Sequence, residues 1–426
     1  MKSITQRLLS RCRSENVIVG KCSASTLSFE SIERAAGRHA ANMFINSMEK
    51  NSKLIDTPTI CIGDPANASS WEWVAGLDNK PQFSSDDMLK MSKNVNVDAF
   101  KMVEKDITTL SGGIKELLGS DHPVLESCAK YFFEIDGGKK IRPTMVLAVS
   151  YALNSQSRSR GVSQTPVGAS PSQKRLAEII EMIHTASLFH DDVIDKADTR
   201  RGVPSVNQSF GNKLAILGGD FLLSRASICS ARLRNLAVVE LLSTIIEHLV
   251  KGEVMQMRPS STGTSALEYY LRKNFYKTAS LMGHSCLSAA VLGEHSEDDQ
   301  RACYLYGTYV GQAFQLVDDA LDFEGSTATI GKVPLADLKS GLATAPTLYA
   351  ADEFPQLIPL INRKFESPGD IEEAFELVQR SSGLARTRDL AQVHAEKAIE
   401  AITRLEPSPA RDALVALACT VVVRKH

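Results

Sequence analysis

The sequence predicts an all-α protein, one large domain whose helices pack about a central space. From about residue 94 to the end, apolar residues recur three or four positions apart, as on one face of a helix. Leu176, Ile179, Ile180 and Ile183 form one such series. Few stretches show the alternation of a half-buried strand. With 426 residues, 43% of them hydrophobic, the chain is long enough to bury a large core.

Composition narrows the classes of function. The formal net charge is -2, so no global field favours nucleic acid, and an anion site has to be local. The eight cysteines are scattered without a C-x-x-C pair, which argues against a zinc site or a disulfide framework and suits a reducing compartment. No uninterrupted apolar run reaches the length of a bilayer-spanning helix. The longest candidate, 413–423, is expected to be a buried terminal helix.

The chain divides into three parts. Residues 1–27 carry five basic residues, many Ser and Thr and one acid, a composition that predicts a mitochondrial transit peptide, with a disordered N-terminus as the alternative. Residues 28–93 are punctuated by Pro and predict an irregular extension that docks on the body. Residues 94–426 are the helical domain. Within it, 154–172 is rich in Ser, Arg, Gly and Pro and predicts a mobile low-complexity loop.

Two carboxylate clusters suggest the chemistry. In Asp-Asp-Val-Ile-Asp at 191–195, Asp191 and Asp195 are four apart and share a helical face, where their repulsion calls for a cation. In the second cluster Gln315, Asp318, Asp319 and Asp322 form one stripe. Magnesium is commonly held by a few carboxylates together with substrate phosphates. Each cluster alone is more often just a solvated acidic helix face. Together, facing each other, they would hold divalent metal and a polyphosphate.

Basic residues accompany both clusters. Arginines 200 and 201 follow the first, and arginine recognises phosphate through its planar fork. Lys139 and Arg142 follow a Gly-Gly pair, and further lysines stand at segment edges. A lone basic residue of this kind is by default a surface residue, and a lone His184 would be a core histidine.

Five motifs, in this order, resemble those of the trans-isoprenyl diphosphate synthases. They are Gly-Gly-Lys-x-x-Arg-Pro at 137–143, His-x-x-Ser-Leu-x-His-Asp-Asp-x-x-Asp at 184–195, Arg-Arg-Gly at 200–202, Lys-Thr at 277–278 and Phe-Gln-x-x-Asp-Asp-x-x-Asp at 314–322. The resemblance covers about 94–426. The segments 198–202, 218–226 and 336–346 look like those of the long-chain all-trans-polyprenyl diphosphate synthases that make quinone side chains.

The resemblance implies an isoprenoid-synthase-type helix bundle around a central apolar cavity, with magnesium, more than one ion, as cofactor. The implied metal ligands are Asp191, Asp192, Asp195, Asp318, Asp319 and Asp322. The implied contacts to the allylic diphosphate are Arg200, Lys277, Thr278, Gln315 and Lys332. The implied contacts to isopentenyl diphosphate are Lys139, Arg142, His184 and Arg201. Asp191, Asp195, Lys277 and Asp318 would carry catalysis.

One departure from the family pattern concerns diphosphate binding. Short-chain relatives often carry a lysine where this chain has Leu342, and no diphosphate contact is assigned there. Whether Lys339, three residues earlier, replaces it stays open.

The residues before the first cluster predict product length. Ala186 and Ser187 lie five and four positions before Asp191, about one helical turn deeper, and both are small. Farnesyl-making relatives typically carry aromatic bulk there as a floor. We therefore expect a product longer than geranylgeranyl diphosphate.

Two other functions stay open beside the synthase. One is a non-catalytic or regulatory subunit of a heteromeric synthase, and the other is a class I terpene cyclase. The expected partners are the two small-molecule substrates and no nucleic acid. We also expect peripheral membrane association for product release, a mitochondrial location, and a homodimer, with a heteromer as the alternative.

Overall fold

Helices make up about 80% of the described chain. The computed structural model describes residues 80–94, 97–119, 123–134, 140–162, 165–200, 202–257, 266–324 and 335–424, all of which belong to one unit, Asn67–His426. The predicted transit peptide and residues 28–79 of the predicted extension lie outside these residues. The only strands among them are β1 (Thr199–Arg200) and β2 (Val203–Pro204), which pair antiparallel as a two-stranded hairpin. The prediction of an all-α fold is confirmed.

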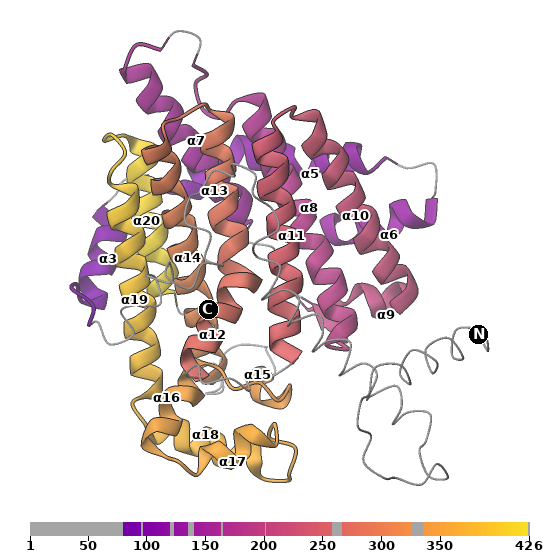
Figure 1. The fold of residues 1–426 in the computed structure, drawn as a ribbon, viewed down its shortest axis with the longest axis vertical. Coiled ribbons are helices and arrows are strands. Elements are labelled where there is room, and N and C mark those ends of the chain that lie inside the picture. The colour runs from indigo at the N-terminus through magenta and orange to yellow at the C-terminus, as the bar shows by residue number, and fades with distance from the viewer. Residues whose placement is uncertain are drawn as a thin grey trace, which may run out of the picture. The chain divides into compact units, whose positions relative to one another are not determined.

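The helices, drawn in Figure 1, have the following bounds. They are α3 (Ser85–Asn94), α4 (Ala99–Met102), α5 (Glu104–Leu118), α6 (Pro123–Glu134), α7 (Ile141–Ser159), α8 (Pro171–Ile194), α9 (Val206–Phe210), α10 (Asn212–Arg232), α11 (Leu236–Met257), α12 (Ala266–Asn274), the π-helix η3 (Phe275–Ala279), α13 (Ser280–Leu292), α14 (Glu297–Glu324), α15 (Ala336–Lys339), α16 (Ala345–Glu353), α17 (Leu357–Asn362), α18 (Asp370–Arg380), α19 (Gly383–Ile402) and α20 (Pro409–Val423).

Two long helices carry the carboxylate clusters. Helix α8 begins with a capping box, in which Ser170 and Gln173 each satisfy the other's backbone N–H, and it has Pro171 in its first turn. It ends at Asp195, its C-cap. Helix α14 begins with Glu297, Asp298 and Asp299, whose charges complement the helix dipole, and runs through the second cluster to Glu324. Helix α8 packs on α7 and α10, while α14 packs on α13 and α19.

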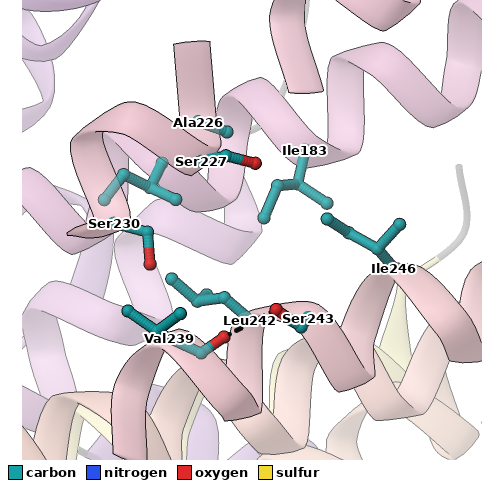
Figure 2. A pocket seen from close by; sticks show the side chains of 9 residues that line it. Ile183, Ala226, Ser227, Ser230, Val239, Leu242, Ser243 and Ile246 are labelled. Atoms are coloured by element: carbon teal, nitrogen blue, oxygen red, sulfur yellow. Dashed lines mark hydrogen bonds between the residues drawn. The ribbon is translucent and has the colours of Figure 1, made fainter. Parts of the chain in front are cut away.

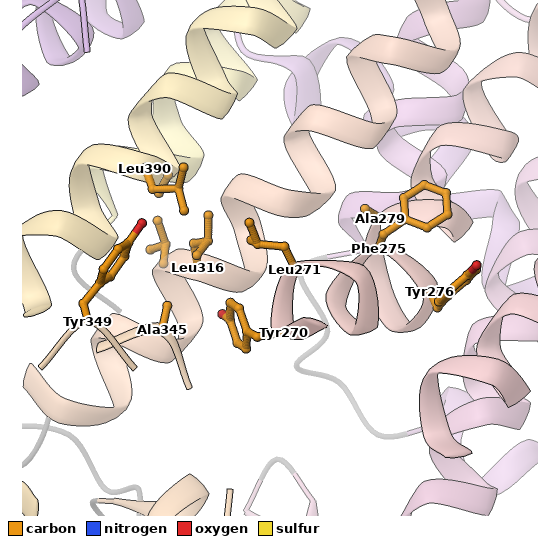
Figure 3. Packing of buried hydrophobic residues seen from close by; sticks show 11 residues of the cluster. Tyr270, Leu271, Phe275, Tyr276, Ala279, Leu316, Ala345, Tyr349 and Leu390 are labelled. Atoms are coloured by element: carbon orange, nitrogen blue, oxygen red, sulfur yellow. The ribbon is translucent and has the colours of Figure 1, made fainter. Parts of the chain in front are cut away.

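Buried apolar residues fix α12 and η3 against α14, α16 and α19. Figure 3 shows Tyr270, Leu271 and Phe275 of α12 and η3 packed with residues of these three helices. Leu271, Phe275 and Leu316 are fully buried. Close packing of this kind holds the backbone of η3 rigidly beside the second cluster.

Two boundaries differ from the expectations. Helix α3 lies within the segment predicted to be irregular, and it packs on α20. The predicted loop 154–172 is shorter, because α7 continues to Ser159 and α8 begins at Pro171. Asn154 is buried and donates to the Gly168 carbonyl and to Gln173, which ties the loop to both helices. Polar composition misled here because the polar side chains bind one another.

Helix α10 is, by length and composition, apolar enough to cross a membrane, and 39% of that stretch is buried. Counting uninterrupted apolar runs did not reveal it, since its apolar residues are interspersed with Gly and Ser. A core helix passes the same test. Helix α10 packs on α8, α6 and α9.

Candidate active site

The first carboxylate cluster lies at the C-terminal end of α8. The Asp195 N–H donates to the Asp191 carbonyl at 2.8 Å, which keeps both residues in the last turn. Burial raises the pKa of Asp191 to about 6, against the opposing charge of Lys277, and Glu253 and Asp195 raise it further. Burial also raises the pKa of Asp195. Within the described part of the chain, neither carboxylate makes a hydrogen bond or an ion pair, so both remain unneutralised.

Asp192 points to a different partner. Arg200 donates from Nε to both Asp192 oxygens, at 2.8 and 2.9 Å, and from Nη2 to Oδ1 at 2.6 Å. Asp192 is buried, whereas the Arg200 side chain is about one-third exposed. The fork of the guanidinium therefore anchors the β1–β2 hairpin to α8 and keeps Arg200 at the edge of the cluster. The metal role assigned to Asp192 stays a prediction.

The π-helix η3 places two consecutive residues of the site. It interrupts the continuous helix formed by α12 and α13, and π-bulges of this kind are frequent at functional sites. Lys277 forms an ion pair with Glu253 of α11 at 2.6 Å and lies within electrostatic range of Asp191 and Asp195. Thr278 donates to Gln315 at 2.9 Å. One turn of η3 thus reaches the first cluster with one residue and the second with the next.

The second cluster is partly engaged in a buried network. Gln315 donates to Asp319 Oδ1 at 2.8 Å, and the Tyr270 hydroxyl donates to the other oxygen of Asp319. Asp319 is buried, and burial raises its pKa to about 6 although the nearby Lys273 ammonium lowers it. Burial also lowers the pKa of Lys273. With both oxygens occupied, Asp319 orients Gln315 and thereby Thr278.

The remaining two aspartates of this cluster have separate partners. Asp322 accepts hydrogen bonds from the Ala336 and Asp337 N–H groups, both at 3.1 Å, and so caps the first turn of α15. Asp318 forms an ion pair with Arg424 at 2.7 Å. The Asp318 side chain is 41% exposed, whereas Asp319 is buried, so Asp318 has more room for a further ligand than Asp319 has.

Arg142 and His184 are brought together as expected of a common subsite. Arg142 Nη1 lies 3.1 Å from His184 Nε2, which links the start of α7 to α8. Ala186 is buried on α8, and Ser187 donates to the His184 carbonyl at 2.9 Å. Lys139, Arg201 and Lys332 lie outside the described residues.

Several residues of the site were missed in the sequence. They are Glu253, Tyr270, Lys273, Asp337 and Arg424. Burial raises the pKa of Asp337 to about 8, and the nearby Asp319 and Asp322 carboxylates add to the effect. The Lys-Gly-Glu triplet ending at Glu253, charged within an apolar helix, was a signal for that residue.

Lys339, the candidate replacement for the missing lysine, is the last residue of α15. Leu342 follows the helix, and its N–H donates to the Asp337 carbonyl at 2.9 Å.

The donor set fits a hard divalent cation. In the described part of the chain, no three acidic, His or Cys side chains are close enough to hold a metal ion by themselves. Asp191 and Asp195 nevertheless offer carboxylate oxygens whose mutual repulsion a cation would relieve. Magnesium is usually bound by one or two carboxylates plus water and substrate phosphates, which suits a site completed by its substrate.

The arrangement suits chemistry on an anionic leaving group. Cationic Arg200 and Lys277 flank two unneutralised carboxylates, with hydroxyl and amide groups of Thr278 and Gln315 beside them. Preorganised charges of this kind act most strongly where charge develops in the transition state.

Comparisons with known proteins identify enzymes that act on such anionic substrates. The model of the polyprenyl synthetase family matches residues 122–378. The chain is 40% identical to the probable mitochondrial hexaprenyl pyrophosphate synthase of Neurospora crassa, over 95% of each chain. It is 45% identical to mitochondrial solanesyl-diphosphate synthase 1 of Oryza sativa, over 74% of this chain and 75% of that one.

Solved structures give the same result. A polyprenyl synthase from Caulobacter crescentus, complexed with calcium and isoprenyl diphosphate, superposes with a TM-score of 0.68 at 30% identity, covering 77% of this chain and 97% of that one. A decaprenyl diphosphate synthase from Rhodobacter capsulatus gives the same score and identity over 76% and 97%. Synthases of this type use a divalent metal. The chain therefore belongs to the polyprenyl synthetase family and is a prenyltransferase.

Proposed function

We propose that this prenyltransferase condenses isopentenyl diphosphate head to tail onto an allylic diphosphate and makes a long all-trans-polyprenyl diphosphate, from which the side chain of ubiquinone is built. One observation carries the proposal. Consecutive residues of η3, Lys277 and Thr278, reach the two carboxylate clusters, so one diphosphate lying along η3 would be within reach of both.

The chain's own residues account for the ionisation step. Arg200, Lys277, Thr278 and Gln315 would bind the allylic diphosphate and orient its C–O bond. Mg²⁺, when bound at Asp191, Asp195 and Asp318, would supply Lewis-acid stabilisation of the departing pyrophosphate. The C–O bond breaks with both electrons going to pyrophosphate and leaves an allylic cation. Arg142 and His184, with Lys139 and Arg201, would hold the diphosphate of isopentenyl diphosphate. Its double bond attacks the cation, and the proton then lost passes to pyrophosphate.

A cavity deeper along α8 supports a long product. It has a volume of about 60 Å³ and lies between α8, α10 and α11 (Figure 2). Ile183 and Ile179 line it, eight and twelve residues before Asp191, which corresponds to about 12 and 18 Å along a helix. Ala186 and Ser187 lie between the cavity and Asp191 on this helix. The tail would therefore pass two small residues before it meets branched side chains.

Location and assembly are part of the proposal. Relatives named as mitochondrial, together with the basic N-terminal composition, support a mitochondrial location. Exposed apolar residues on α10 and α11, among them Leu217 and Leu236, support a homodimer that buries this face. A relative from Schizosaccharomyces pombe, 43% identical over 78% of this chain, is named as subunit 1 of a decaprenyl-diphosphate synthase, which keeps a heteromer as the alternative. Peripheral membrane association would let the long product leave the enzyme.

Product analysis tests the proposal. The protein is incubated with Mg²⁺, farnesyl or geranylgeranyl diphosphate and labelled isopentenyl diphosphate, and the products are sized by chromatography. A lengthened diphosphate is expected, with more than four isoprene units. A cyclic hydrocarbon would indicate a terpene cyclase, and turnover only after addition of a second protein would indicate a non-catalytic subunit.

A further inference from the structure

Lys277 has three carboxylates within electrostatic range but contacts one of them. Its ammonium is 2.6 Å from Glu253 Oε2, whereas Asp191 and Asp195 sense its charge without an ion pair. The Glu253 and Lys277 side chains are 11% and 20% exposed, so water screens the pair only weakly. The arrangement leaves the two aspartates of the first cluster without an ion-pair partner among the described residues.

The backbone is built to bring Glu253 to Lys277. Gly252 precedes Glu253 on α11, and a Cβ at this position would lie 2.8 Å from both the backbone N and Cγ of Lys277. Only glycine therefore allows α11 to approach η3 this closely. The close approach and the ion pair are separate observations, and both place Glu253 against the π-helix η3.

We propose that Glu253 is a positioning residue, which holds the ammonium of Lys277 away from Asp191 and Asp195 so that both carboxylates stay available to a divalent cation. Without the Glu253 charge, the ammonium would be free to pair with a carboxylate of the first cluster, whose two aspartates already sense its charge. That pairing would neutralise one ligand and add a positive charge beside the metal. The inference rests on the metal role proposed above for Asp191 and Asp195.

Direct measurement of Mn²⁺ binding tests this role. The full-length protein is titrated with Mn²⁺ in the presence of inorganic pyrophosphate, and free Mn²⁺ is followed by electron paramagnetic resonance. Glu253→Gln is expected to weaken Mn²⁺ affinity about tenfold. Adding Lys277→Gln to this variant removes the displaced ammonium and is expected to restore the affinity of the Lys277→Gln single variant. A double variant that stays as weak as Glu253→Gln would assign Glu253 a merely structural role and overturn the proposal.

The chain offers a matched control. Glu247 pairs with Lys251 at 2.6 Å on the same helix, but its side chain is 56% exposed and lies outside the site. Glu247→Gln should leave Mn²⁺ affinity unchanged, and an equal loss in both Gln variants would count against the proposal. If Glu253→Gln lowers the melting temperature strongly, the same titration is done with Glu253→Asp instead. Because the aspartate side chain is shorter, Glu253→Asp should weaken Mn²⁺ affinity about threefold, and adding Lys277→Gln should again reverse the loss. An unchanged Mn²⁺ affinity in Glu253→Asp would overturn the proposal.

A further variant separates the two levels of the argument. If Asp191→Asn combined with Asp195→Asn leaves Mn²⁺ binding intact, the metal assignment itself is wrong. If that variant abolishes binding while Glu253→Gln behaves as wild type, only the positioning role of Glu253 is wrong.

Discussion

Arg424 places Nη2 2.7 Å from Oδ1 of Asp318 and thereby joins the C-terminal end of the described chain to the second carboxylate cluster. The same nitrogen donates to the Phe314 carbonyl at 2.8 Å, and the guanidinium lies 4.0 Å from the centroid of the Phe314 ring. Three contacts to one helical turn of α14 hold the arginine in place. They also restrict the rotation of the Asp318 carboxylate.

Arg424→Gln is expected to lower kcat/KM for the allylic diphosphate about tenfold, because Asp318 is then free to rotate away from the position proposed for metal binding. The loss of stability should be small, about 1 kcal/mol, since Asp318 is partly exposed. Steady-state kinetics and chemical denaturation measure the two effects. Arg411→Gln, which removes a pair with Asp412 at the start of α20, serves as the control. Equal kinetics in both variants would contradict the positioning of Asp318 by Arg424.

Ala186→Phe is expected to shorten the product, because an aromatic ring on α8 would block the path between Asp191 and the cavity. Chromatographic sizing of the products measures the change. Ala177 is also buried on α8 but lines a different groove, toward α5. Ala177→Phe should therefore strain the helix packing to a similar degree without changing product length. Unchanged product length in Ala186→Phe, with the protein folded by circular dichroism, would refute the floor argument.

Ile183→Ala is expected to lengthen the product, since it enlarges the cavity deeper along α8. Truncating a buried isoleucine should also cost about 3 kcal/mol of unfolding free energy. Leu176→Ala is the matched control, because Leu176 is fully buried on the same helix and does not line this cavity. Both variants should lose similar stability, and only Ile183→Ala should change the product distribution. A shift in both would mean that general loosening of α8 sets the length.

His394 should make the protein sensitive to acid. Burial lowers the pKa of His394 from 6.5 to about 3, and neither ring nitrogen has a hydrogen-bond partner among the described residues. The unfolded chain therefore takes up a proton below pH 6.5 that the folded chain refuses, so stability falls as the pH is lowered from 6.5 toward 3. Between pH 6.5 and 4 the loss should be about 3 kcal/mol. His394→Leu should remove this part of the pH dependence in urea denaturation, and an unchanged slope would show that His394 does not contribute.

The sequence predicts the parts of this site that local helical spacing determines. Asp191 with Asp195, and Gln315 with Asp319, lie as their spacing indicates because each pair is within two turns of one helix. Partners from distant segments were not predictable in this way. Arg424 is 106 residues from Asp318, and Arg200 reaches Asp192 only because the β1–β2 hairpin turns back toward α8. The π-helix η3 was also not predictable, because the spacing of its apolar residues does not differ from that of the α-helices around it.

The π-helix η3 determines what the loss of a single codon would do to the protein. A π-bulge accommodates one residue more than a regular α-helix would. Loss of a single codon within Phe275–Ala279 would let the segment close into a regular α-helix, and the reading frame would be kept. Because the bulge absorbs the extra residue locally, α12 and α13 would keep their relative rotation after such a loss. The bulge that places Lys277 beside Glu253 and Thr278 beside Gln315 would be lost, so an in-frame deletion would leave a folded protein without this arrangement of the two residues.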